Sequence, residues 1–331
     1  MISLSKESAR IVFFGTPEFA VSSLDSLVTG GYNVVAVVTA PDKTGGRGNR
    51  IIQSAVKQYA IEHDIPLLQP EKLRDPDFLS QLQDLKADLQ IVIAFRMLPE
   101  VVWAMPPLGT FNLHASLLPK YRGAAPINWA VINGETTTGV TTFFLNHTID
   151  TGDIIHQQSI QIGPTETVGD VYSRLMDLGA KVTIQTVDDI LAGQVKPIPQ
   201  AQLLIDSEPT PAPKIFVETC HIDWTRTAVQ IHNLVRGLSP YPAAWTEITD
   251  RNGNSIHTKI FTTALPRAET TAYFNQVADK VHACNTPGSL CSDGRRLAVA
   301  TGDNQWLEIL SLQIAGKRRM QTQEFLRGFR L

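Results

Sequence analysis

The segment Thr110–His114 places two polar side chains in alternation with apolar ones. Phe111 and Leu113 are apolar, whereas Asn112 and His114 could take part in chemistry. Successive side chains of a strand point to opposite faces, so Asn112 and His114 share one face. An amide can donate to a developing oxyanion, and an imidazole exchanges a proton near neutral pH. The pair suits addition of a nucleophile to a carbonyl, although spacing alone favours a buried strand end with two satisfied polar groups.

Three further motifs follow this segment. Ser-Leu-Leu-Pro occupies 116–119, Lys-Tyr-Arg-Gly-Ala-Ala-Pro occupies 120–126, and Asp-Thr-Gly-Asp occupies 150–153. With these residues the chain resembles the folate-dependent formyltransferases, in which an Asn-x-His-x-Ser-x-Leu-Pro segment and a later Asp-Thr-Gly-Asp segment carry the site. The resemblance is greatest to the branch of that family that acts on methionyl-tRNA, and it extends from Val12 to Met320.

The resemblance implies a role for each motif. Asn112 would donate to the oxyanion, and Asp150 would fix the tautomer of His114 and favour its protonated form. An Asx-turn or a cap is the alternative reading of Asp150. One wall of the folate site would come from Ser116, Leu117, Leu118 and Pro119. The implied reaction is formyl transfer from 10-formyltetrahydrofolate to the α-amine of initiator methionyl-tRNA, without a metal.

Basic residues occur at two places where they could contact phosphates. Residues 41–50 combine turn formers with three cations and include Gly-Arg-Gly, which the resemblance places against the tRNA acceptor stem. Three adjacent cations lie near the C-terminus, where a barrel could present them to RNA. The candidate tRNA-binding residues are Arg47, Arg50, Lys317, Arg318 and Arg319. Solvated loops and faces are the ordinary reading of such runs.

Composition predicts an ordinary globular protein. The chain has 331 residues and a net charge of −3, so its charge does not indicate a nucleic-acid partner. From Asp206 onward, 14 Lys and Arg face 12 Asp and Glu, which makes the C-terminal part slightly basic. Three widely spaced cysteines suggest neither a disulfide framework nor a zinc site. No apolar run is long enough to span a bilayer, so we expect a soluble, cytoplasmic protein. We also expect a monomer.

The N-terminal part reads as alternating strands and helices. Near-continuous apolar runs predict buried strands at 10–14, 33–39 and 89–95, and the alternating segment 110–114 adds a further strand, with helices between them. This pattern predicts a parallel sheet with right-handed crossovers, a Rossmann-like α/β fold. Gly15 ends the first strand, but the further glycines of a dinucleotide fingerprint are missing, which disfavours a nicotinamide dehydrogenase. Apolar residues at helical spacing also predict a helix over Ile51–His63.

The chain divides into two predicted domains. We expect a formyltransferase catalytic domain over 1–193, a Pro-rich linker over 194–213 and a tRNA-binding domain over 214–331. Short strands separated by Gly, Asn and Asp turns predict a small barrel in the last part, and the resemblance implies an OB-like fold.

Two rival functions remain open at this point. One is a formyltransferase for a sugar nucleotide or a purine precursor, because such relatives share the Asn, His and Asp pattern. The other is a non-catalytic RNA-binding protein, which the intact Asn112, His114 and Asp150 disfavour. Arg96 and Met97 depart from the Tyr-Gly-x-Ile-Leu-Pro that is frequent in the family. The resemblance therefore does not define the wall of the folate pocket at these two residues.

Overall fold

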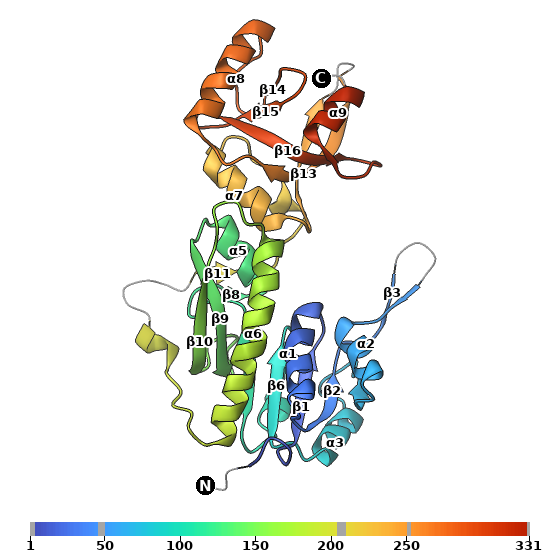
Figure 1. Ribbon diagram of the computed structural model, residues 1–331. Coiled ribbons are helices and arrows are strands. Elements are labelled where there is room, and N and C mark those ends of the chain that lie inside the picture. Colours follow the sequence, from blue (N-terminus) through green and yellow to red (C-terminus); the bar gives the residue numbers. More distant parts are fainter. Residues whose placement is uncertain (1–3, 46–49, 204–209, 250–252, 330–331) are drawn as a thin grey trace. The chain divides into compact units, whose positions relative to one another are not determined.

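The computed structural model describes residues 4–45, 50–203, 210–249 and 253–329 (Figure 1). Backbone contacts divide the chain into two compact units. Unit 1 comprises 1–124, 139–160 and 172–212, and unit 2 comprises 125–138, 161–171 and 213–331.

Unit 1 is built on a seven-stranded sheet with the order β10-β9-β7-β6-β1-β2-β5. Strands β5, β2, β1, β6 and β7 run parallel, and β9 is antiparallel to β7. The bounds of the strands are β1 Ile11–Gly15, β2 Val34–Val38, β5 Leu67–Leu68, β6 Leu89–Ile93, β7 Thr110–His114, β9 Thr137–Phe144 and β10 Ile154–Gln161. The predicted Rossmann-like parallel sheet is therefore confirmed.

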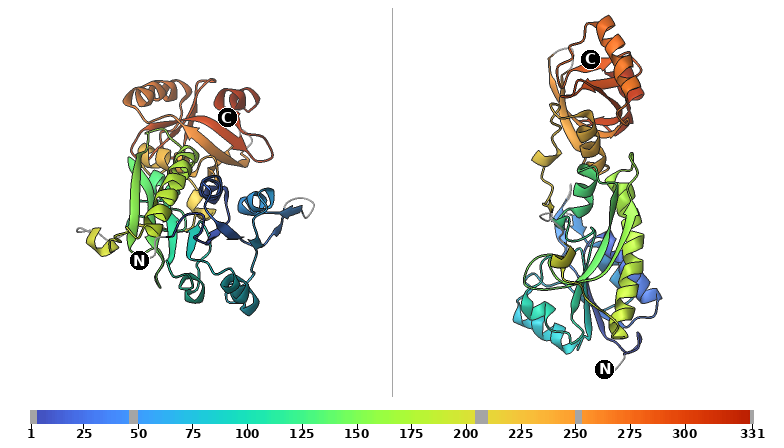
Figure 2. Two further views of the ribbon diagram at one scale, coloured as in Figure 1. Left: turned by 60° about the horizontal axis from the view of Figure 1, so that its bottom comes forward. Right: turned by 90° about the vertical axis from the view of Figure 1, so that its left-hand side faces the viewer.

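Helices cover both faces of this sheet. They are α1 Glu18–Thr29, α2 Ala55–Glu62, α3 Pro76–Asp84, α4 Glu100–Trp103 and α6 Val168–Leu191. On one face α6 passes so close to β7 that a Cβ at Gly179 would lie 2.8 Å from the Leu113 side chain. On the other face Val12, Phe14 and Val92 pack with the apolar side chains of α3 and α4. Figure 2 shows helices on both sides of the sheet in its right-hand view.

The order of strands places the site. Strand β1 lies between β2 and β6, so the chain changes direction across the sheet after β5. In open parallel sheets, ligands bind beyond the carboxyl ends of the strands near such a switch point. His114 is the last residue of β7, at that edge of the sheet. The fold thus positions the chemistry-bearing segment where a ligand is expected.

One expected helix was wrong at its start. Residues Arg50–Ile52 form strand β4, which pairs antiparallel with β3 (Lys43–Gly45). Helix α2 begins only at Ala55, where the Ser54 hydroxyl accepts a hydrogen bond from the backbone of Lys57. The apolar spacing could not reveal this, because Ile51 and Ile52 are exposed on the hairpin rather than buried on a helix face.

Unit 2 contains a curled antiparallel sheet with the order β12-β13-β16-β15-β14, and β17 pairs with β16 (Figure 2). Its elements are α5 Pro126–Ile132, α7 Ala228–Leu238, β12 Ala244–Thr249, β13 Ser255–Thr263, α8 Ala268–Val281, β14 Leu290–Ser292, β15 Leu297–Ala300, β16 Trp306–Ile314, β17 Met320–Gln321 and α9 Thr322–Gly328. Apolar residues of α7 and α9 fill its concave side. Sequence patterns missed α8, since only Phe274 and Ala278 of that helix are buried.

Among the described residues, the helices are all too short or too polar to cross a bilayer.

Candidate active site

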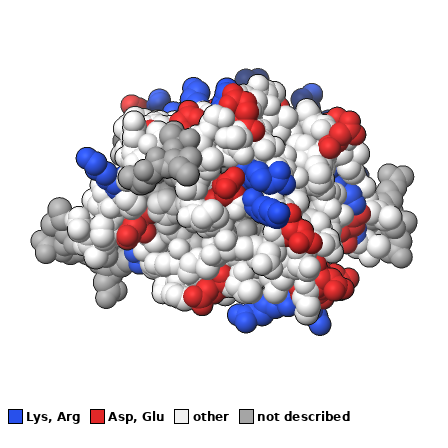
Figure 3. Space-filling view, turned by 90° about the horizontal axis from the view of Figure 1, so that it is seen from below, with Lys and Arg blue, Asp and Glu red and all other residues white. Residues whose placement is uncertain are grey.

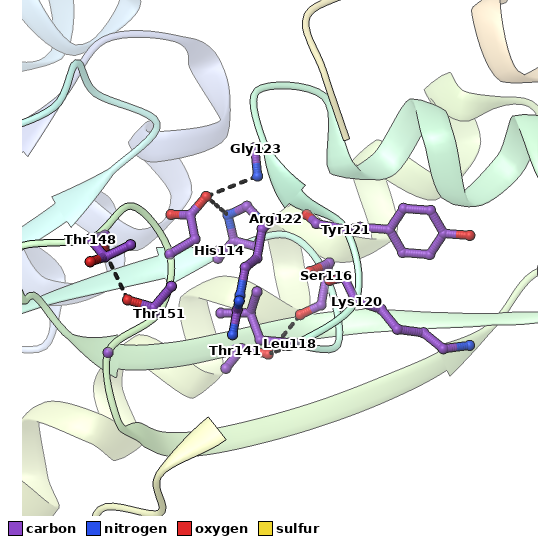
Figure 4. Close-up of polar contacts among 12 residues, drawn as sticks. His114, Ser116, Leu118, Lys120, Tyr121, Arg122, Gly123, Thr141, Thr148 and Thr151 are labelled. Carbon is purple, nitrogen blue, oxygen red and sulfur yellow. Dashed lines mark hydrogen bonds and ion pairs between the residues drawn. The ribbon is translucent and has the colours of Figure 1, made fainter. Parts of the chain in front are cut away.

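His114 is buried at the tip of β7 and contacts protein groups through both ring nitrogens. Its Nε2 lies 2.8 Å from the carbonyl oxygen of Tyr121, and its Nδ1 lies 3.9 Å from Oδ2 of Asp150 (Figure 4). A carbonyl only accepts, so Nε2 carries a proton and donates it. In the neutral ring, the Nδ1 lone pair then faces the carboxylate. A proton taken up at Nδ1 creates an ion pair with Asp150.

This geometry corrects one part of the expected role of Asp150. The carbonyl of Tyr121, rather than the carboxylate, sets the tautomer of His114, because it accepts the Nε2 proton. A separation of 3.9 Å is also too long for a hydrogen bond from Nδ1. The carboxylate instead accepts a hydrogen bond from the backbone N–H of Gly123 at 2.9 Å. Its contact with His114 is therefore a through-space one between the carboxylate and Nδ1.

The turn that carries Asp150 is held close to the end of β9. Asp150 adopts a left-handed conformation with φ of 53°, which Asp tolerates better than most residues. A Cβ at Gly152 would lie only 1.6 Å from the carbonyl oxygen of Phe144, so this position requires glycine. The Thr151 hydroxyl donates to the carbonyl of Thr148 at 3.0 Å (Figure 4). The Asp-Thr-Gly sequence therefore encodes the close approach that brings the carboxylate to His114.

Asn112 lies on the same face of β7 as His114, as the strand alternation predicted. Its side chain is half-buried. Among the described residues, no group hydrogen-bonds to the Asn112 amide. A neutral donor on this face can therefore hydrogen-bond to an oxygen that arrives with a substrate.

The predicted folate-binding segment forms a tightly bonded loop. Ser116 donates from its hydroxyl to the carbonyl of Lys120 at 2.7 Å and accepts at its carbonyl from Thr141 at 2.6 Å. The N–H and carbonyl of Leu118 bond to the side chains of Thr141 and Gln157. Leu117 is half-buried, and Pro119 is buried after a cis peptide bond. Ser116 and Leu118 thus shape the loop, and their polar groups are already used within the protein.

A second loop joins the site to a distant part of the chain. Arg122 and Gly123 form strand β8, which pairs in parallel with β11 (Pro211–Ala212). The Arg122 guanidinium donates to Oε1 of Gln200 at 3.1 and 2.6 Å. A role for Gln200 at the site could not be predicted from the sequence, because an isolated amide between prolines in a linker has no periodic or motif signal. Only the fold places it beside the Asp150 turn.

The predicted tRNA-binding residues have different surroundings. Arg47 lies outside the described residues, and Arg50 is the first residue of β4. Arg318 forms an ion pair with Glu324. The Arg319 guanidinium lies 4.6 Å from the centre of the Phe261 ring. Lys317 is exposed and, within the described part of the chain, has no side-chain partner.

Charges on the face drawn in Figure 3 are mixed, with Lys and Arg interspersed among Asp and Glu.

Arg96, which departs from the family pattern, donates to the carbonyls of Pro70 and Glu71. Within the described residues, no group of three His, Cys, Asp or Glu side chains is arranged to hold a metal ion.

The fold agrees with the family models that match this chain. Residues 9–187 match the model of the formyl transferase family, and residues 214–330 match the model of the formyl transferase C-terminal domain. The chain belongs to the formyl transferase family.

The relatives that are most similar in sequence among those compared belong to one branch of this family. A methionyl-tRNA formyltransferase of Bacteroides fragilis is 56% identical over 99% of this chain and 97% of its own length. One from Parabacteroides distasonis is 54% identical over 99% of this chain and 98% of its own length. A solved sugar 3N-formyl transferase, WlaRD, shares the fold with a TM-score of 0.64 over 94% of this chain and 99% of its own, at 18% identity.

Proposed function

We propose that this protein transfers the formyl group of 10-formyltetrahydrofolate to the free α-amine of initiator methionyl-tRNA, giving N-formylmethionyl-tRNA. The observation that carries the proposal is the contact of 3.9 Å between buried His114 and half-buried Asp150 at the tip of β7, on the face that presents Asn112. The relatives that are 56% and 54% identical over nearly the whole chain are methionyl-tRNA formyltransferases. The solved sugar formyltransferase was studied with 5-N-formyl-THF, which supports a folate-derived donor.

Proton transfer is assigned to Nδ1 of His114, since its Nε2 proton is bonded to the carbonyl of Tyr121. The attacking amine must lose a proton, and the nitrogen of the departing folate must gain one. Asp150 stabilises the proton while it resides on Nδ1. Acid–base assistance of this kind contributes about 10²- to 10⁴-fold.

Asn112 is assigned to the oxygen that becomes negative when the amine adds to the formyl carbon. Its amide is neutral and points from the same face as His114, so it can donate without changing the proton balance. The cationic form of His114 adds electrostatic stabilisation of the same oxygen. The wall of the donor site is assigned to the loop of Ser116, Leu117, Leu118 and Pro119.

The tRNA contacts are assigned to Arg47, Arg50 and Lys317–Arg319. With them we propose the division into a catalytic domain over 1–193, a linker over 194–213 and a tRNA-binding domain over 214–331. The ranges of the two matched family models, 9–187 and 214–330, support these boundaries.

A direct assay tests the function. The protein is incubated with 10-formyltetrahydrofolate and initiator tRNA charged with methionine, and the ester is analysed for formylmethionine. A parallel reaction replaces the tRNA with an amino-sugar nucleotide. Formylation of the sugar and not of the methionyl ester would assign the protein to the rival branch of the family. Absence of transfer to either acceptor would contradict the enzymatic proposal.

A further inference from the structure

Gln200 is a buried amide that uses both ends of its side chain. It lies in a short 3-10 helix, Gln200–Leu203, and its residue is 3% exposed. Its Oε1 accepts from Nε and Nη2 of Arg122 at 3.1 and 2.6 Å. Its Nε2 donates to the carbonyls of Asp150 and Gly152, each at 2.9 Å. One side chain therefore joins two segments that are 28 residues apart in sequence, at Arg122 and Asp150.

The two joined segments are those that hold His114. On either side of Arg122, the Tyr121 carbonyl accepts from His114 and the Gly123 N–H donates to the Asp150 carboxylate. The second segment carries the carboxylate itself. The distance between the segments therefore determines how far the Asp150 carboxylate lies from the His114 ring.

Strand β11 adds a backbone connection to the same loop. The N–H of Tyr121 donates to the carbonyl of Thr210 at 2.6 Å, and the N–H of Ala124 donates to the carbonyl of Ala212 at 2.8 Å. A Cβ at Gly123 would lie 2.5 Å from the Ala212 oxygen, so the two strands are in close contact. The chain after α6 thus supports the site through Gln200 and through β11.

We propose that Gln200 is a positioning residue that holds the Asp150 carboxylate at His114 by fixing the Arg122 loop to the Asp150 turn. Neither Glu nor Leu can replace it, because the site needs an acceptor for a guanidinium and a double donor for two carbonyls. The kinetic consequence rests on the proposed formyl transfer, whereas the geometric consequence for His114 does not.

Two variants and one control test the positioning role. Gln200→Leu removes all four hydrogen bonds, whereas Gln200→Glu keeps the volume and the acceptor for Arg122 but loses the donors. Gln202→Leu makes the same apolar change at an exposed position of the same 3-10 helix. We expect kcat to fall about 10- to 100-fold in both Gln200 variants, because small misplacements of reacting groups have effects of that size. KM for tRNA should stay within about twofold, and the control should match wild type.

A double-mutant cycle separates positioning from general destabilisation. If Gln200 acts through the carboxylate, Gln200→Leu in an Asp150→Asn background should lower kcat by less than about twofold. An equal loss in both backgrounds would show that Gln200 acts on stability or on another group, and would overturn the proposal. Should Gln200→Leu fail to fold, the same cycle is run with Gln200→Glu.

The state of the His114 ring provides a readout without substrate. We expect ¹⁵N NMR, with the His114 signals assigned from a His114→Gln variant, to show a single Nε2–H tautomer in the neutral wild-type ring. In Gln200→Leu and Gln200→Glu the two tautomers should mix, since the Tyr121 carbonyl is no longer fixed. Unchanged ring signals would overturn the positioning role. Changed ring signals in the two variants, together with a wild-type protein that formylates no methionyl-tRNA, would instead refute the proposed function alone.

Discussion

The His114–Asp150 pair and the basic segment Lys317–Arg319 both present charged groups, but the protein surrounds them differently. His114 is buried and Asp150 is half-buried, and backbone groups of Tyr121 and Gly123 fix both partners. The basic segment is exposed, and two of its three cations are engaged by protein groups, Arg318 by Glu324 and Arg319 by the ring of Phe261.

The difference shows what makes a charged residue functional in each region. At the strand tip, a residue matters because its geometry is imposed by neighbours that approach from distant segments. In the basic segment, a cation matters only if its own protein leaves it available for phosphate. Substitution of a charged residue is therefore expected to have a large effect on catalysis in the first region and a small, salt-dependent effect on binding in the second.

The largest expected effects test the His114–Asp150 pair. Asp150→Asn and His114→Ala should each lower kcat by about 10²- to 10⁴-fold, because the proton site at Nδ1 loses its stabilising charge or disappears. Steady-state kinetics with saturating tRNA and formyl donor measure this loss. Asp153→Asn changes the exposed carboxylate of the same turn and should keep wild-type kcat. A near-normal kcat in Asp150→Asn would remove the carboxylate from the mechanism.

The next largest effect distinguishes an oxyanion donor from a structural amide. Asn112→Ala should lower kcat by about 10²- to 10³-fold, which is the usual cost of losing one such donor. Because no described group bonds to this amide, the melting temperature should stay within about 1–2 °C of wild type. Thermal unfolding and single-turnover kinetics on one preparation measure both quantities. A large drop in melting temperature with normal turnover would assign Asn112 to the core.

The features that could be predicted from the sequence are those that depend on neighbouring residues in the chain. Alternation in Thr110–His114 predicted the strand and the shared face of Asn112 and His114, and the apolar runs predicted the parallel sheet. Family resemblance brought Asp150 to the same site, which spacing could not do across 36 residues. The Asp-Thr-Gly order has a physical reason that emerged only from the fold, namely the close approach of Gly152 to the Phe144 carbonyl.

The remainder depends on contacts between distant segments. Nothing local marks Gln200 as a buried amide, or the Tyr121 carbonyl as the group that sets the tautomer of His114. The β3–β4 hairpin was likewise missed, since its isoleucines are exposed and resemble a helical apolar stripe. The partners of Arg318 and Arg319 come from α9 and β13, which composition alone could not connect to them.

A smaller effect is expected from the basic segment, and it sharpens the contrast between free and engaged cations. Lys317→Ala should raise KM for tRNA a few-fold and reduce the salt dependence of binding by about 0.7–0.9 in the log–log slope, the value of one phosphate contact. Its melting temperature should not change, since the side chain has no partner in the described part of the chain.

Arg319→Ala is the matched comparison within the same segment. It loses the ring contact with Phe261 and the hydrogen bond to the Ser311 hydroxyl at 2.9 Å. We expect it to lower the melting temperature by a few degrees, as a loss of about 1 kcal/mol does, with a smaller change in salt slope than Lys317→Ala. Equal salt slopes for the two variants would show that engagement by the protein does not decide which cation binds phosphate.

The smallest expected effect concerns His232, a buried histidine of unit 2. Nδ1 of His232 lies 2.8 Å from the Thr263 hydroxyl, and Nε2 lies 3.2 Å from the carbonyl of Pro164. Burial lowers the pKa of His232, and the nearby Arg236 lowers it further, although the Pro164 carbonyl acts in the opposite direction. The folded state therefore favours the neutral ring of His232.

The sign of the pH effect follows from this lowered pKa. The unfolded chain takes up a proton at His232 near pH 6.5, whereas the folded chain resists it, so the contribution to stability is present above that pH. It is lost as the pH falls through the lower pKa of the folded state. We expect the melting temperature of wild type to fall more steeply between pH 7.5 and pH 5.0 than that of His232→Gln, measured by calorimetry. The exposed His282 provides the control, since His282→Gln should keep the wild-type slope. If His232→Gln loses stability as steeply as wild type, the acid sensitivity arises elsewhere in the protein.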